Sequence, residues 1–311
     1  MSSAKTASNS IKKSKMKKLI LLLVILTFNF SAKAECSFSG INVWPNQQNI
    51  APNSIFVVEG YAQSQELILQ LNKKNRIYLT GNAVRIPLKV LRILKGQFGL
   101  TQAILQPERE LQTGKTYELQ IGGLGEYEKQ DYKVAKWTVS SKKDLDKPVW
   151  ECLPIYNSRS YTSFGCGPEM HVNFCGIFKD NSPTLIYAKV FNRKNKTHSD
   201  YFLTSEGQNI SIGHGMCSGA FAFDKDTDYE VQFGLMDASG NENMKLTEPV
   251  KFTSPTSKDE SDSESVCNCT TKSTVSNKTA GKSNLLIYSL LGGVIAAIGI
   301  VVYLKQKNAV S

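Results

Sequence analysis

Histidine is scarce in this sequence of 311 residues, which contains three: His171, His198 and His214. A structural zinc site needs two pairs of closely spaced histidine or cysteine ligands. His214 and Cys217 are three residues apart, but no second pair of this kind matches them. The sequence also lacks a Ser-His-Asp pattern and a paired histidine and carboxylate. We therefore predict no catalytic residues, no metal ligands and no cofactor, and hence no enzymatic activity.

Acidic residues are absent from positions 1–34, where seven lysines supply most of the formal net charge of +10. Lys305 and Lys307 supply two more positive charges near the other end. The residues between are nearly neutral, which excludes a polybasic face and a nucleic-acid partner. Among them, residues 36–143 hold 14 basic and 8 acidic side chains, whereas residues 144–254 hold 10 and 14. This opposite sign favours attraction between the two segments, or self-association of neighbouring copies.

The N-terminal end has the pattern of a signal peptide, which we predict over residues 1–34. A run of lysines precedes an apolar stretch at 19–30, and its twelve residues are too few to span a bilayer. A small-x-small cleavage pattern precedes Glu35, where the mature chain would begin. Met16 is an alternative start, because the signal is complete from that residue. An uncleaved anchor and lipidation of Cys36 are further alternatives, although the residues before Cys36 do not match a lipobox.

The C-terminal end has the pattern of a transmembrane helix over residues 285–304. These twenty residues carry no charge, and at the helical rise they span about 30 Å, the thickness of the hydrocarbon layer. Tyr288 and Tyr303 lie near the ends, as interfacial aromatics do. The basic tail at 305–311 is expected in the cytoplasm. We predict a single-pass protein of the cell membrane with its N-terminal domains outside the cytoplasm; the alternative is a sorting tail that is processed for attachment to the cell surface.

Large aliphatic residues are nearly absent from residues 255–284, where Val266 and Val275 are the only two. Serine, threonine, asparagine and charged residues dominate instead. Such a segment buries too little apolar area to offset the entropy of ordering its chain. We predict a disordered stalk that holds the folded part away from the membrane.

The residues between signal and stalk have short apolar runs, turn signals and no long helical period, which predicts two β-domains at 35–143 and 144–254. Residues 84–94 alternate between apolar and polar side chains, as a strand does. Residues 66–71 and 76–80 flank a polar loop and are expected to form a hairpin. The fold class expected is all-β.

Two motifs resemble those of bacterial immunoglobulin-like and fibronectin type III-like modules. Residues 111–121 and 226–231 each show a polar turn, then a tyrosine, then alternating apolar residues. The resemblance implies that Tyr117 and Tyr229 are corner tyrosines whose hydroxyls bond back to the backbone. Residues 237–241 (DASGN) resemble the hairpin before the last strand of such modules. Together, the resemblance implies two tandem immunoglobulin-like β-sandwiches outside the cytoplasm. It implies no enzymatic reaction.

Four of the seven cysteines lie in the second predicted domain, and an exported chain favours their oxidation. We expect two disulfides within this domain, of open connectivity, among Cys152, Cys166, Cys175 and Cys217. Cys36 has no obvious partner. Cys267 and Cys269 lie in the predicted stalk, where pairing with another chain or attachment to lipid is more favourable than a strained bond between near neighbours.

These patterns favour a membrane-anchored binding, adhesion or scaffold protein without catalysis, whose partner at the cell surface is an unknown protein or glycan. Residues 215–219 (GMCSG) match the G-x-C-x-G pattern of a nucleophile elbow, so a membrane-tethered hydrolase using Cys217 is the alternative. An elbow requires a strand before it and a helix after it, whereas these residues lead to another strand.

Overall fold

The computed structural model describes residues 39–81 and 83–259. The chain divides into a compact unit from Met1 to Thr270 and a second unit from Thr271 to Ser311, and all described residues belong to the first. The predicted signal peptide and the predicted helix at 285–304 lie outside the described residues. Within the described ranges, no helix is both long and apolar enough to cross a membrane.

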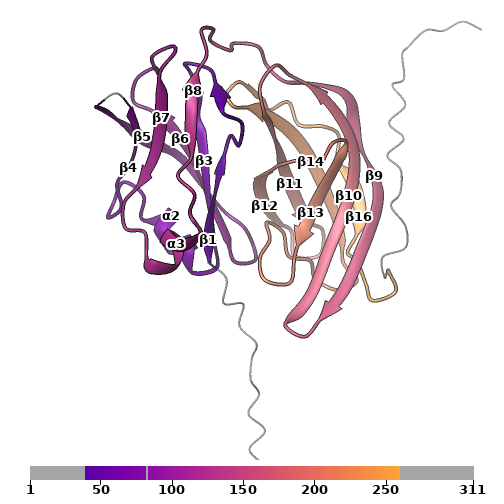
Figure 1. Ribbon diagram of the computed structural model, residues 1–311. Helices are drawn as coiled ribbons and strands as arrows, with labels where there is room; N and C mark the ends of the chain where they lie inside the picture. The colour runs from indigo at the N-terminus through magenta and orange to yellow at the C-terminus, as the bar shows by residue number, and fades with distance from the viewer. Residues whose placement is uncertain (1–38, 82, 260–311) are drawn as a thin grey trace, which may run out of the picture. The chain divides into compact units, whose positions relative to one another are not determined.

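Strands dominate the described chain, so the expectation of an all-β fold is confirmed (Figure 1). The first group is β1 (Gly40–Trp44), β2 (Asn49–Ile50), β3 (Phe56–Tyr61), β4 (Ile77–Gly81), β5 (Val84–Lys95), β6 (Leu100–Pro107), β7 (Thr116–Ile121) and β8 (Lys136–Val139). The second group is β9 (Val149–Phe164), β10 (Gly167–Lys179), β11 (Thr184–Asn192), β12 (Thr197–Leu203), β13 (Asn209–His214), β14 (Asp228–Asp237), β15 (Glu242–Asn243) and β16 (Val250–Thr253).

Three short helical segments interrupt the first group: η1 (Ala62–Ser64), α2 (Gln65–Leu69) and α3 (Glu126–Asp131). The strand expected at 66–71 is wrong, because α2 occupies most of it. Glutamine, glutamate and leucine favour helix, and adjacent Leu67 and Ile68 are both buried. Two neighbouring buried residues fit one face of a helix, whereas in a strand they would point to opposite faces.

The strands of the first group follow one path of hydrogen-bonded neighbours, in the order β1-β3-β6-β5-β4-β7-β8-β2. β5 belongs to both halves of this path: its first four residues pair with β4, and its remainder pairs with β6. A register shift between Val90 and Arg92 lets the strand bend where it changes partners. The strands enclose a core in which the rings of Phe56 and Trp137 lie 4.6 Å apart.

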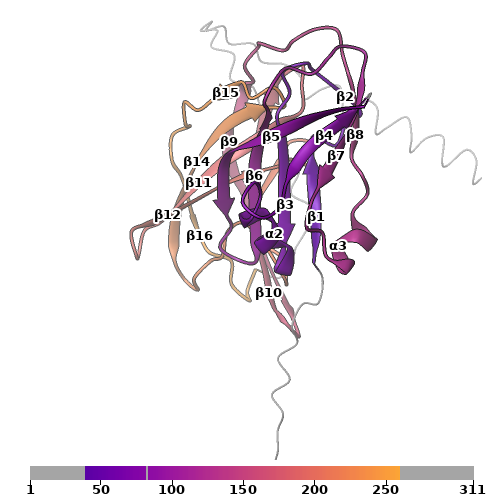
Figure 2. The same ribbon diagram turned by 90° about the vertical axis from the view of Figure 1, so that its left-hand side faces the viewer.

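The second group forms a sheet in the order β13-β10-β9 and another in the order β12-β11-β14-β15, with β16 also paired to β14. Strands β11, β12 and β14 of the second of these sheets are labelled in Figure 2. Aromatic side chains fill their core. The ring of Phe174 on β10 lies 5.2 Å from that of Phe233 on β14 and 5.8 Å from that of Phe252 on β16. These contacts join the two sheets, because each aromatic ring removes a large apolar area from water.

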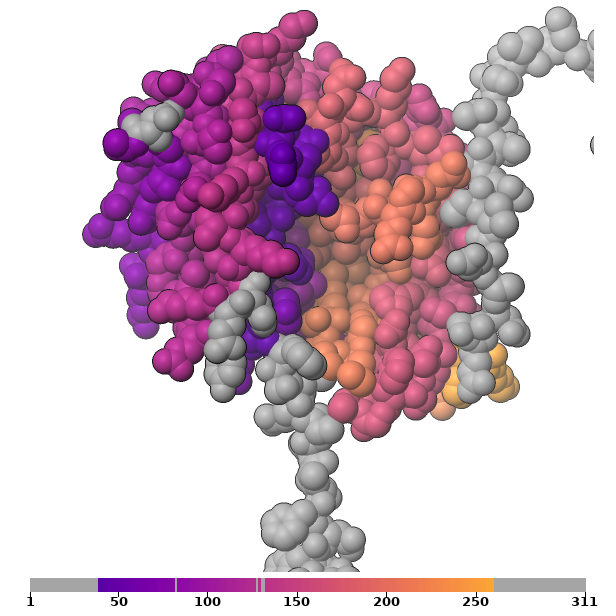
Figure 3. Space-filling view, in the orientation of Figure 1, coloured from indigo at the N-terminus to yellow at the C-terminus, as the bar shows by residue number. Residues whose placement is uncertain are grey.

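One hydrophobic core crosses the boundary between the two groups. It contains buried residues from both, including Trp44, Val57 and Ile104 of the first group. Backbone hydrogen bonds reinforce it: Ile55 N–H donates to the Ala238 carbonyl at 2.8 Å. In the space-filling view, atoms of the indigo N-terminal strands lie against orange atoms of the second group (Figure 3). The first group thus has one core of its own, and the core of the second group extends onto residues of the first.

Candidate functional site

A groove lies between β1 and β12, each of which is the last strand at one end of its sheet. Its cavity of about 370 Å³ falls within the usual range for small-ligand sites. β1 supplies Asn42, Val43 and Trp44, and β12 supplies Tyr201, Phe202 and Leu203. The floor and rim are completed by Asn46, Val57, Glu59, Leu100, Gln102, Leu185, Thr204, Gly213 and Ala220.

Buried polar groups hold the two walls of the groove together. The side chain of Gln102 on β6 donates to the Phe202 carbonyl at 3.2 Å and accepts from the Phe202 N–H at 3.0 Å. Gln102 thus satisfies the outward backbone groups of one residue of β12, as a neighbouring strand would. Its side chain is 2% exposed, so these bonds are sheltered from water. These two bonds consequently hold the backbone of β12 at Phe202 to β6.

Tyr201 and Glu59 form the charged part of the groove. The Tyr201 hydroxyl donates to Glu59 Oε2 at 2.9 Å, and Asn42 Nδ2 donates to Glu59 Oε1 at 3.2 Å. Burial raises the pKa of Tyr201, and the Glu59 carboxylate raises it further. Tyr201 therefore stays a neutral donor at physiological pH. The groove presents an aromatic wall with one carboxylate, which suits an amphipathic ligand.

This groove could not be predicted from the sequence. Its residues come from strands about 140 positions apart, as Glu59 and Tyr201 show. No local pattern marks them, since each reads as an ordinary strand residue. An unusual Glu in the apolar strand β3 was the only local signal available.

Three carboxyl groups also meet, those of Asp144, Asp180 and Asp237, with oxygens within 4.8 Å of one another. Carboxylate oxygens are ligands that calcium prefers. Hydrogen bonds from the protein already reach them, however. Asp237 Oδ1 accepts from the N–H groups of Ser239 and Asn241, both at 2.8 Å. The cluster joins the segment between the two strand groups to the turn after β14, and its bonds account for it without a cation.

The pKa of Asp237 is raised to about 6, mainly by burial and to a smaller extent by the carboxylate of Asp180. The hydrogen bonds from Asn241 and Ser239 act in the opposite direction and lower it. Burial likewise raises the pKa of Asp180, with Asp144 acting in the same direction. Asp180 and Asp237 therefore hold protons more readily than exposed carboxyls do. The turn that contains Asp237 is visible in the sequence, whereas the meeting of its carboxyl group with those of Asp144 and Asp180 is not.

A second polar group lies on β10 and β13, where Glu169, His171 and Ser211 line a cavity of about 530 Å³. His171 Nε2 lies 3.3 Å from Glu169 Oε1, and its Nδ1 lies 3.2 Å from the Ser211 hydroxyl. Burial lowers the pKa of His171, against the opposing effect of Glu169, so the ring is neutral at pH 7. A neutral ring between a carboxylate and a hydroxyl can act as a general base toward that hydroxyl. The sequence showed no such constellation, because Ser211 is forty positions from His171.

The predicted disulfide cysteines have different environments. Cys152, Cys175 and Cys217 are each disulfide-bonded. Cys166 is a free, exposed thiol in the turn between β9 and β10, so the expectation that it pairs needs correction. At that hairpin tip its flanking residues are glycines, which bring no other side chain near it. The connectivity of the other three stays open.

Cys217 does not lie in a nucleophile elbow. The residues after it form bridges to Phe98 and His214 through Gly219 and then continue as irregular chain, with no helix among them. A cysteine in a disulfide also lacks the thiolate that attacks a substrate. Both findings remove the basis for a hydrolase that uses Cys217.

Tyr117 and Tyr229, predicted as corner tyrosines, bond to backbone five residues upstream. The hydroxyl of Tyr117 accepts from the N–H of Gln112 at 3.2 Å, and that of Tyr229 accepts from the N–H of Asp224 at 2.7 Å. Tyr229 also accepts from Asn192 Nδ2 at 3.3 Å. Both tyrosines are nearly fully buried, so these bonds fix the turns that enter β7 and β14.

No protein-family model and no curated protein matches the chain. Among solved structures it is similar to pullulanase from Anoxybacillus sp. LM18-11 in complex with maltotriose, at 8% identity and a TM-score of 0.20, over 60% of this chain and 23% of that one. The chain is also similar to a cytokine receptor complex, at 10% identity and a TM-score of 0.21, over 68% of this chain and 94% of that one. A third similar structure is the N-terminal Ig1-2 module of the Drosophila receptor protein tyrosine phosphatase DLAR. Its identity is 12% and its TM-score 0.20, over 69% of this chain and 98% of that one. The chain thus spans under a quarter of the pullulanase, and these TM-scores are too low to carry an argument.

Proposed function

We propose that this chain is a binding protein whose groove between β1 and β12 takes an extended segment of a protein partner. The observation that carries the proposal is the pairing of two sheet ends around one cavity with aromatic walls. A strand at the end of a sheet offers backbone donors and acceptors to a peptide, and neighbouring pockets select its side chains. Trp44 and Tyr201 supply the apolar contact, and Glu59 supplies a carboxylate for a basic or hydroxyl-bearing side chain.

The proposal includes the place where this binding happens. The signal pattern at 1–34, the apolar stretch at 285–304 and the three disulfide-bonded cysteines support a membrane-anchored protein with its domains outside the cytoplasm. The all-β fold and the corner tyrosines support a pair of immunoglobulin-like sandwiches. Self-association of copies, suggested by the opposite charges of the two domains, is a further part of the proposal.

A random peptide library displayed on phage tests the groove, with the soluble ectodomain of residues 35–284 as bait. Selected peptides should lose at least about tenfold in affinity for Asn42→Trp, because the exposed Asn42 lines the groove and an indole there fills it. Gln112→Trp is the matched control, since Gln112 is exposed at a turn outside the groove. Peptides that bind both variants equally would place the partner site elsewhere, and selective binding on a glycan array would replace the protein partner by a glycan.

One observation favours a second candidate, a serine hydrolase, namely the chain of contacts from Glu169 through His171 to Ser211. A fluorophosphonate probe would label Ser211 if its hydroxyl were activated, and Ser211→Ala would abolish the labelling. We rank this candidate second because Ser211 lies within the ladder between β13 and β10, opposite Asn173, rather than on a strained turn. Absence of labelling at Ser211 would retire it.

A further inference from the structure

A second cavity adjoins the groove between β1 and β12. It is the cavity of about 530 Å³ that Glu169, His171 and Ser211 line. Leu203 and Thr204 belong to its wall as well, and both of these residues also line the groove. The remaining lining residues are Ser160, Asn173, Glu206 and Asn209. A partner segment that lies along β12 in the groove therefore reaches this cavity at Leu203 and Thr204.

The sheet β13-β10-β9 places polar side chains of the cavity on one face. Ser160 on β9 lies opposite His171 on β10, and Ser211 on β13 lies opposite Asn173 on β10. Residues directly opposite each other in an antiparallel ladder point to the same side, and so do residues two apart on one strand. Glu169 therefore shares this face with His171, and the sheet forms a polar floor for the cavity.

The cavity carries negative charge, and no lysine or arginine is among the residues that line it. Glu169 contacts His171, whose ring is neutral because burial lowers its pKa. No lysine or arginine of the described residues forms an ion pair with Glu206. Asn209 also lines the cavity, and its buried Oδ1 has no hydrogen-bond donor in the described part of the chain. A buried acceptor without a donor costs free energy, so a ligand that brings donors and positive charge is favoured.

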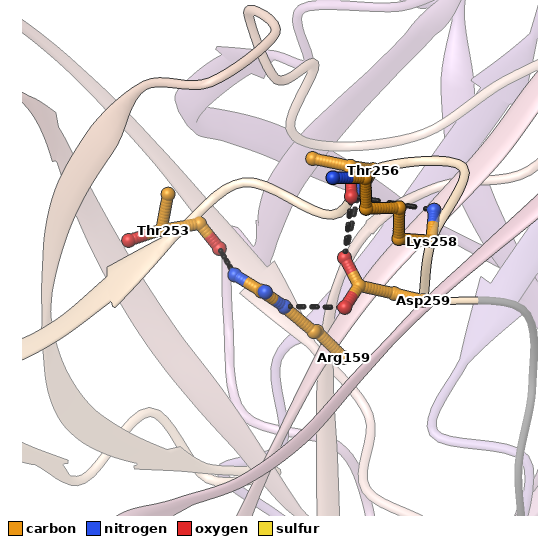
Figure 4. Close-up of polar contacts among 5 residues, drawn as sticks. All are labelled: Arg159, Thr253, Thr256, Lys258 and Asp259. Carbon is orange, nitrogen blue, oxygen red and sulfur yellow. Dashed lines mark hydrogen bonds and ion pairs between the residues drawn. The ribbon is translucent and has the colours of Figure 1, made fainter.

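The arginine of β9 is bonded elsewhere. Arg159 lies opposite Val172, a core residue, so its side chain leaves the strand on the other face of the sheet. Arg159 Nε lies 3.0 Å from Asp259 Oδ1, and its terminal nitrogen donates to the Thr253 carbonyl at 3.4 Å (Figure 4). Residues 255–259, expected as the start of the stalk, are thus held against β9. The charge of Arg159 is therefore balanced by Asp259 and does not neutralise the cavity.

We infer that this cavity takes a basic side chain, lysine or arginine, of the partner segment that occupies the groove. The inference rests on the function proposed above, because the segment must lie along β12 for its side chain to enter the cavity. An ammonium or guanidinium group has donors only and a positive charge, which match the carboxylates of Glu169 and Glu206. Residues 144–254 hold 14 acidic and 10 basic side chains, so their charge attracts a basic segment as well.

Peptides selected from a random library on phage test the inference, with the full chain in detergent micelles as bait and a chelator present. They should share a lysine or arginine, and replacing it by norleucine or citrulline should weaken binding about tenfold or more. Glu206→Gln should weaken binding of the basic peptide by a similar factor. It should leave the neutral peptide unaffected, which also shows that the variant is folded. Glu248→Gln is the matched control, since it removes an exposed carboxylate of the same strand group outside both the groove and the cavity.

The results distinguish a failure of the basic pocket from a failure of the groove. Basic peptides that bind Glu206→Gln as tightly as the unmodified protein, but lose affinity for Asn42→Trp, would keep the groove and overturn the basic pocket. Selected peptides without a shared basic residue would do the same. Peptides that bind Asn42→Trp unchanged would overturn the groove and the pocket together. Binding that appears only when a divalent cation replaces the chelator would make a metal ion the occupant and overturn the basic pocket.

Discussion

The buried carboxyl of Asp237 should make the protein less stable as the pH rises through about 6. Its pKa is raised from 3.8 to about 6, so the folded state holds this proton over a range where the unfolded state has released it. The contribution to stability is therefore full below pH 3.8 and is lost as the pH rises to about 6. At 1.36 kcal/mol for each pKa unit, the loss amounts to about 3 kcal/mol.

Urea unfolding of residues 35–284 between pH 4 and pH 7, with a chelator present, measures this effect. Asp237→Asn keeps an oxygen that accepts from the Ser239 and Asn241 N–H groups, but it removes the titrating proton. Stability of the unmodified protein relative to this variant should fall by about 3 kcal/mol over that range. Asp226→Asn, in an exposed turn, shows the effect of removing one carboxylate that is not buried. A pH-independent difference between the protein and Asp237→Asn would refute the reasoning.

Two other outcomes follow from the packing and the cysteines. Ile104→Ala should destabilise the protein by about 2–5 kcal/mol, because Ile104 lies in the core that contains residues of both strand groups. Calorimetry should show one shared unfolding transition at a lowered temperature. Two separate transitions, with only the first shifted, would contradict the shared core. Iodoacetamide should modify Cys166 in the native protein and leave Cys152, Cys175 and Cys217 until reduction, as mass spectrometry would show; native modification of Cys217 would contradict this.

Features of the fold that depend on a few adjacent residues could be predicted from the sequence. The turn before each corner tyrosine spans about six residues, so its pattern is visible in one short window. The strand expected at 84–94 agrees closely with β5, because its apolar side chains alternate. These features need no knowledge of distant parts of the chain.

Features that depend on distant residues could not be predicted in this way. The end of β9 is polar and alternates poorly, so its strand structure comes from pairing with β10 across a tight turn. The groove combines β1 with β12, and only tertiary packing brings Glu59 near Tyr201. The state of Cys166 likewise depends on what surrounds the hairpin tip rather than on the number of cysteines nearby.

The core shared by the two strand groups has a consequence for recognition. Proteins that bind between two separately folded domains commonly close around a ligand by a hinge motion. Here Trp44 and Val57 pack into the same apolar interior as the second group, and Gln102 holds the backbone of β12 at residue 202. Opening such a hinge would expose this interior to water. The groove should therefore meet its ligand with a preset width and discriminate by shape, without domain closure.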